Sequence, residues 1–170
     1  PGPHSWQHAS RVASTKTPQV PAPNNRATEG SLAAIFISYR RSDAWAEARA
    51  LSTDLAQKFG ERSVFMDVDN IALGRDFRVV LAELLGSCQV MIVLIGPKWL
   101  DACDENGKRR LDDPDDWVRA EVEAALGRDI QVVPVLVDGA RIPTVAQLPA
   151  DISKLAYRNA FELTQPRWRS

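Results

Sequence analysis

The side chains best suited to chemistry, Trp117 and Glu121, lie four residues apart in the stretch LDDPDDWVRAEVEAAL. Asp113 is suited to be an N-cap and Pro114 a first helical residue, which predicts a helix that begins near Pro114. At helical spacing Trp117 and Glu121 lie one turn apart, at the rim of the helix's core-facing stripe. The residues of that stripe are Val118, Val122, Ala125 and Leu126.

An indole beside a carboxylate can stack on a flat ring and stabilise a cation, so this pair is a candidate site. The structural alternative is that Trp117 packs at the rim and Glu121 is solvated, which is the commoner use of both residue types. Spacing by itself favours this alternative.

The segment SYRRSD at 38–43 leaves an apolar run with an aromatic ring and two guanidinium groups. Ser42 and Asp43 are expected to cap a following helix. Guanidinium forks and helix N-terminal amides suit a diphosphate, which makes Tyr39, Arg40, Arg41 and Ser42 candidate ligands. A solvated basic turn is an equally good interpretation, and the segment is not a glycine-rich phosphate loop.

The segment DVDNIALGRDF at 67–77 combines carboxylates with apolar residues. Asp67 and Asp69 resemble half of a phosphoacceptor pocket. That interpretation lacks its main part, because the apolar run ending in IGPKW supplies no aspartate to phosphorylate. Ile71 and Leu73, just before Gly74, would expose apolar surface on a loop, which suits a contact with another protein.

These residues are positioned by short apolar runs that alternate with amphipathic stretches, a pattern typical of a parallel sheet covered on both faces. Strands are predicted at 32–38, 63–66, 89–95, 130–137 and, more weakly, 156–162; helices are predicted at 43–59, 76–85 and 114–128. The simplest arrangement is an α/β, doubly wound, five-stranded parallel sheet of order 2-1-3-4-5. Ligands of such sheets bind at the carboxyl ends of the strands, where the order reverses between the first and third.

Composition and charge indicate which partners the protein can have and in which cellular compartment it lies. The 170 residues carry a formal net charge of -1, so nucleic acid is not expected as a direct partner. Cys88 and Cys103 form no CxxC or Cys/His cluster, which indicates neither a zinc site nor a disulfide framework and favours a reducing, cytoplasmic location. The longest apolar run, 90–95, is far too short for a membrane span.

Residues 1–31 are rich in Pro, Ser and Thr without an apolar period, so we expect a linker or tail before a domain at 32–170. Both histidines, His4 and His8, lie in this segment. Histidine acid/base chemistry and histidine metal ligation are therefore not expected in the folded part.

Taken in order, IFISYRRSD, VFMDVDNIALGRDF, VLIGPKW and DDWVRAEVEAAL resemble a Toll/interleukin-1 receptor (TIR) domain, particularly the bacterial type. The resemblance covers about residues 33–161 and implies a flavodoxin-like fold. The family's last motif is represented only by RW at 167–168, so the last helix is expected to be truncated. Many members cleave NAD between nicotinamide and ribose with the glutamate of a Trp-x-x-x-Glu motif, here Trp117 and Glu121.

The resemblance implies an NAD glycohydrolase that produces nicotinamide and ADP-ribose or a cyclic ADP-ribose, with NAD as substrate and neither cofactor nor metal. It makes Glu121 catalytic and Trp117 a wall for nicotinamide. Tyr39, Arg40, Arg41, Ser42 and Asp69 would then meet ribose and diphosphate.

Self-association in head-to-tail TIR contacts would use Ile71, Leu73 and Gly74, and a fused or partner sensor domain would trigger immune or defence-type signalling. The alternative is a non-enzymatic TIR adaptor that acts through TIR–TIR contacts. No membrane partner is expected.

Overall fold

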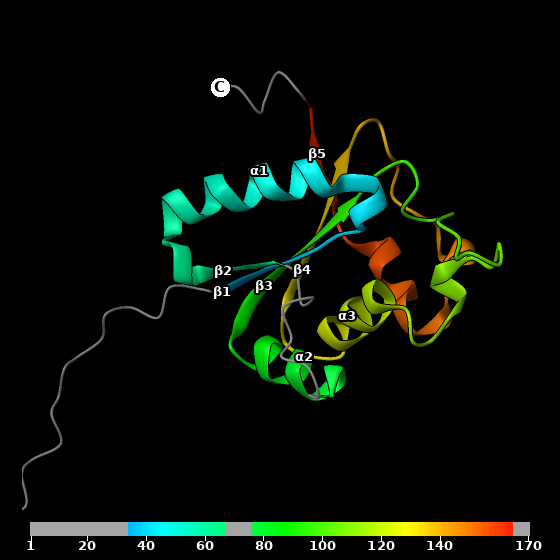
Figure 1. Cartoon of the computed structure of the whole chain (residues 1–170), viewed down its shortest axis with the longest axis horizontal. Helices are drawn as coiled ribbons and strands as arrows, with labels where there is room; N and C mark the ends of the chain where they lie inside the picture. Colours follow the sequence, from blue (N-terminus) through cyan, green and yellow to red (C-terminus); the bar gives the residue numbers. More distant parts are fainter. Residues whose placement is uncertain (1–33, 67–75, 165–170) are drawn as a thin grey trace, which may run out of the picture. The chain divides into compact units, whose positions relative to one another are not determined.

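The computed structural model describes residues 34–66 and 76–164, which form a parallel sheet with helices on both faces (Figure 1). The strands are β1 Ala34–Ser38, β2 Val64–Met66, β3 Cys88–Ile95, β4 Gln131–Val137 and β5 Phe161–Leu163. The α-helices are α1 Arg41–Phe59, α2 Phe77–Gly86 and α3 Trp117–Leu126. The short 3₁₀ helices are η1 Glu61–Ser63, η3 Arg110–Asp112, η4 Val145–Gln147 and η5 Ala150–Tyr157.

The sheet has the order β2-β1-β3-β4-β5 with every pair parallel, which confirms the predicted topology. Phe36 of β1 lies opposite Phe65 of β2 and Met91 of β3, so β1 lies between the edge strand β2 and the central strand β3. The order reverses between β1 and β3, and the carboxyl ends of these two strands therefore flank the crevice in which ligands of such sheets bind.

Strand alternation divides the core into two apolar clusters. Ile35, Ile37 and Tyr39 belong to the cluster that includes Ala44 and Ala48 of α1. Ala34 and Phe36 belong to the other cluster, with the buried residues of α2, α3 and η5. Because successive strand residues point to opposite faces, the next positions on the α3 side are 38 and 40.

Two helices begin elsewhere than predicted. The helix expected from Pro114 begins at Trp117, because Asp113 caps a preceding turn and Asp116 is the N-cap, accepting a hydrogen bond from the Arg119 amide at 3.1 Å. Helix α1 begins at Arg41 without a side-chain cap, and its geometry is interrupted at Ala44. The predicted capping role of Ser42 and Asp43 is therefore wrong.

The last strand was predicted too early. Residues 150–157 form η5, in which Ile152 and Leu155 are fully buried, and β5 begins only at Phe161. Of the predicted strand 156–162, Ala156 and Tyr157 therefore belong to the end of η5, and only the last two residues fall in β5.

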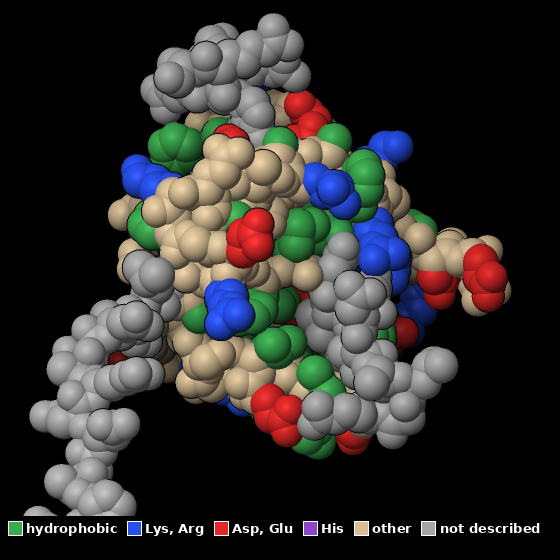
Figure 2. All heavy atoms as spheres, turned by 60° about the vertical axis from the view of Figure 1, so that its left-hand side comes forward, with side chains coloured by type: hydrophobic (Ala, Val, Ile, Leu, Met, Phe, Trp, Pro, Cys, Tyr) green, Lys and Arg blue, Asp and Glu red, His purple; other side chains and the backbone are tan. Residues whose placement is uncertain are grey.

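The long polar segment between β3 and α3 has a defined conformation. Trp99 is fully buried near its start, an isolated antiparallel bridge joins Cys103 to Arg109, and η3 precedes the turn at Asp113. On the face in Figure 2, basic and acidic side chains of the described residues are interspersed with apolar ones. Among the described residues, no helix is long and apolar enough to span a membrane.

Candidate functional site

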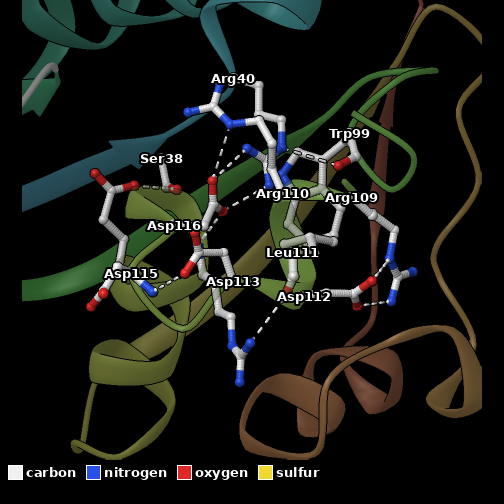
Figure 3. A network of polar contacts seen from close by, with 12 residues as sticks. Ser38, Arg40, Trp99, Arg109, Arg110, Leu111, Asp112, Asp113, Asp115 and Asp116 are labelled. Atoms are coloured by element: carbon white, nitrogen blue, oxygen red, sulfur yellow. Dashed lines mark hydrogen bonds and ion pairs between the residues drawn. The ribbon is translucent and has the colours of Figure 1, made fainter. Parts of the chain in front are cut away.

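The centre of the candidate site is a hydrogen bond between β1 and α3. Ser38, at the carboxyl end of β1, donates through Oγ to Oε2 of Glu121 at 2.6 Å (Figure 3). Ser38 is fully buried and Glu121 is only 7% exposed. The prediction that Glu121 lies at the rim is wrong: it shares the buried face of α3 with Val118, Val122 and Ala125.

A buried carboxylate is costly unless hydrogen bonds replace its water. The Ser38 hydroxyl supplies one such bond and thereby fixes the orientation of the Glu121 side chain. Ser38 did not stand out as a partner of Glu121 in the sequence. The available signal was the alternation of β1, which places Ser38 on the same face as Phe36.

Arg40 is the next residue of β1's alternation on this side, and it forms a buried ion pair with Asp116. Its Nη1 and Nη2 donate to the two carboxylate oxygens of Asp116 at 3.0 and 2.8 Å, and both side chains are 2% exposed. Its Nε donates to the Trp99 carbonyl at 3.1 Å. Every nitrogen of the Arg40 guanidinium therefore contacts protein.

Asp116 is also the N-cap of α3. Its carboxylate accepts from the Arg119 amide at 3.1 Å and lies 3.4 Å from Nε of Arg110. One carboxylate thus joins the end of β1 to the start of the helix that carries Glu121.

Trp117 lies at the rim, as predicted, with 38% of its surface exposed. One ring face is engaged by Phe77 at the start of α2, with ring centroids 4.0 Å apart and an interplanar angle of 30°. A second, exposed link between the same two helix starts is the 2.7 Å ion pair of Arg78 with Asp115. Trp117 is thus held in place while part of its surface remains accessible.

A cavity of about 320 Å³ lies beside Trp117. It is lined by part of the 104–110 segment together with Asp113, Asp115 and Asp116. Acidic and basic side chains both line it, so the cavity has no single sign of charge.

The other predicted ligands are dispersed. Tyr39 is buried in the α1-side cluster, while Arg41 and Ser42 are exposed in the first turn of α1. Asp69, Ile71, Leu73 and Gly74 lie outside the described residues.

Asp43 anchors the turn after β3. Its Oδ1 accepts from the Lys98 amide at 2.8 Å, and a Cβ on Gly96 would lie 2.5 Å from its Oδ2. Glycine at 96 therefore permits the close approach of α1 to this turn. Sequence spacing contained no signal for this contact.

Burial and hydrogen bonding shift the pKa values of three side chains in β3 and near η3. Burial raises the pKa of the Cys88 thiol in β3, and the hydrogen bond from Arg109 lowers the pKa of Asp112 in η3. The same hydrogen bond raises the pKa of Arg109. Within the described part of the chain, acidic, histidine and cysteine side chains form no cluster that could hold a metal.

Comparison with known proteins decides the family. The profile of the TIR domain family matches residues 35–167, which include the sheet apart from Ala34 and include both Ser38 and Glu121. The chain belongs to the TIR domain family. This TIR domain is 30% identical over 127 residues to "NAD(+) hydrolase sarm1" of Drosophila melanogaster, and 30% identical over 129 residues to "NAD(+) hydrolase tir-1" of Caenorhabditis elegans.

These matches cover 74% and 75% of the TIR domain chain but only 9% and 12% of the two relatives. Among solved structures, the TIR domains of the activated Roq1 resistosome directly recognizing the pathogen effector XopQ share the fold, with a TM-score of 0.55 and 14% identity. That likeness covers 77% of this chain and 87% of the other. The flavodoxin-like α/β fold is thereby confirmed.

Proposed function

We propose that this TIR domain is an NAD glycohydrolase that breaks the bond between nicotinamide and ribose, with Glu121 as the catalytic carboxylate. The observation that carries the proposal is the buried Glu121 carboxylate, oriented by Ser38 one helical turn from the accessible Trp117. The names of the two relatives at 30% identity support the same activity.

The chemistry requires a fixed negative charge. As the C–N bond breaks, its electron pair leaves with nicotinamide and positive charge develops on the ribosyl carbon. Glu121 stabilises that charge. Water then adds to the carbon and releases a proton, which gives ADP-ribose; addition of an adenine nitrogen of the same molecule gives a cyclic product instead.

The remaining assignments follow the family resemblance. Trp117 forms a wall for the nicotinamide ring, and Tyr39, Arg41, Ser42 and Asp69 are proposed contacts of ribose and diphosphate. No metal is needed for the bond to break. We further propose that the domain is of the bacterial type, self-associates through Ile71, Leu73 and Gly74, and serves defence-type signalling under a fused or partner sensor.

One observation favours a second function, that of a non-enzymatic adaptor. Trp117 packs on Phe77 and Glu121 is bonded to Ser38, so both side chains have structural partners in the folded domain. An adaptor would use the same fold to present surfaces for TIR–TIR contacts.

Nicotinamide release from NAD by the purified chain, measured by chromatography over a wide range of protein concentration, separates the two. We expect release by the wild type and a fall of about 100-fold or more in Glu121→Gln, which keeps size and removes charge. Glu123→Gln is the matched control, because Glu123 is an exposed glutamate of the same helix. Absence of release at every concentration would favour the adaptor, and unchanged turnover in Glu121→Gln would refute the assignment of Glu121.

A further inference from the structure

We propose that Ser38 and Arg40 form a two-point clamp that sets the position of α3, and that both are positioning residues for the cleavage of NAD. The proposal rests on the proposed function. In this proposal Arg40 positions α3, whereas the family resemblance implies that it contacts the diphosphate.

The clamp follows from strand geometry. Ser38 and Arg40 are two residues apart on a chain leaving β1 in extended conformation, with Arg40 at φ −97° and ψ 124°, so their side chains leave on the same side. That side faces α3. Ser38 reaches Glu121 at 2.6 Å and Arg40 reaches Asp116 at 2.8 Å, so one strand end holds the helix at two points more than one turn apart.

Two contacts with β1 restrict the position of α3 more than one contact would. A single contact to α3 would allow the helix to rotate or slide about it, whereas contacts at residues 116 and 121 determine both its rotation and its translation against β1. Trp117 and Glu121 lie within this span. Helix geometry sets the separation of Trp117 and Glu121, and the two contacts with the strand end set the position of this pair relative to β1.

The ion pair between Arg40 and Asp116 has a geometry that restricts movement of both side chains. A bidentate guanidinium–carboxylate pair is directional, and here both side chains of the pair are buried. The Nε bond to the Trp99 carbonyl fixes the guanidinium plane from a third segment, the turn after β3. Figure 3 shows Arg40 reaching Asp116, with Trp99 beside it.

The hydrogen bonds that all three guanidinium nitrogens make with protein, and the 2% exposure of the side chain, argue against direct contact with substrate. A diphosphate could replace Asp116 at Arg40 only by leaving a buried carboxylate with a weaker partner, Arg110 at 3.4 Å. Arg41, which is exposed in the first turn of α1, is the proposed contact of the diphosphate instead.

The test measures kcat and KM for NAD in Ser38→Ala and Arg40→Lys. Misplacement of a reacting group by about 1 Å can cost on the order of 100-fold in rate, so we expect kcat to fall about 10-fold or more in each variant. KM should stay within about threefold, because neither side chain touches the substrate. A raised KM with unchanged kcat in Arg40→Lys would instead make Arg40 a ligand and overturn the proposal.

Each variant has a control that loses a comparable bond elsewhere. Ser63→Ala removes a buried hydroxyl that donates to the Phe59 carbonyl at 2.8 Å, on the α1 side of the molecule. Arg119→Lys weakens a bond at 2.6 Å to Asp151, which anchors the same helix α3 to η5 rather than to β1. Both controls should keep kcat within about twofold; an equal loss in Arg119→Lys would show that any loosening of α3 suffices and would refute the clamp.

A second measurement is independent of activity. The amides of Arg119 and Ala120 bond to the side chain and the carbonyl of Asp116. Their hydrogen exchange, followed by NMR, should accelerate about 10-fold or more in Arg40→Lys, relative to α2 amides. If wild-type protein releases no nicotinamide, the proposed function fails while exchange still decides the clamp; unchanged exchange in Arg40→Lys would overturn the clamp whatever the activity.

Discussion

Ser38 and Glu121 are 83 residues apart in the chain, yet the hydroxyl of one donates a 2.6 Å hydrogen bond to the carboxylate of the other. The contact joins the carboxyl end of β1 to the middle of α3. The proposed catalytic charge is thus placed by the packing of a helix against a strand, at the edge of the sheet where the strand order reverses.

Removing the charge of Asp116 should destabilise the domain strongly. Asp116→Asn retains a good N-cap, so the loss reports the buried ion pair with Arg40 rather than the cap. Leaving the Arg40 cation buried without its partner should lower the free energy of unfolding by about 3–5 kcal/mol, measured by urea denaturation.

The control for this experiment is Asp115→Asn, which removes the ion pair with Arg78. Those side chains are 79% and 68% exposed, so the expected change is below about 1 kcal/mol. Similar losses in the two variants would show that burial does not set the value of the Arg40–Asp116 pair.

A methyl group at residue 96 should also be destabilising. In Gly96→Ala the new Cβ would lie 2.5 Å from Asp43 Oδ2, so α1 and the turn after β3 must separate. We expect a loss of about 1–3 kcal/mol in thermal or urea unfolding. Gly86→Ala, where nothing lies within 4 Å of the added methyl, should be neutral or slightly stabilising.

The double variant Asp43→Ala/Gly96→Ala tests the cause. Removal of the carboxylate relieves the clash, so the double variant should lose less than the sum of the two single variants. Strict additivity would mean that the cost of Gly96→Ala comes from elsewhere.

Self-association is the third prediction, and it concerns the segment between β2 and α2. If Ile71 and Leu73 contact a neighbouring copy, specific activity should rise with protein concentration. Ile71→Asp/Leu73→Asp should lower specific activity and the mass measured by light scattering together, with little change in Tm, because on this proposal the two side chains contact a neighbouring copy rather than the core.

A substitution of equal charge on another surface, Thr53→Asp/Gln57→Asp on α1, is the matched control and should alter neither property. Constant specific activity over a wide dilution series, unaffected by the loop substitutions, would mean that a single copy is complete.

The sequence alone determined the architecture. Apolar runs separated by amphipathic stretches are local patterns, and they were sufficient for the order of the strands and for the two helical layers. The spacing of Trp117 and Glu121 placed them one turn apart, and the motifs around them indicated the TIR family. The alternation of side chains along β1 also predicts that Ser38 and Arg40 lie on the same side of the sheet as Phe36.

Only the tertiary structure decided which polar groups meet. The N-cap of α3 is Asp116 rather than the predicted Asp113, and Asp116 is held by Arg40, which follows a distant strand. Likewise Asp43 accepts a hydrogen bond from the turn after β3 instead of capping its own helix. Ile152 and Leu155 are buried in η5, and β5 begins only after this 3₁₀ helix has ended. Periodicity and capping preferences are encoded within a turn or two of chain, whereas the partner of a buried charge is set by which elements pack together, and that depends on the whole core.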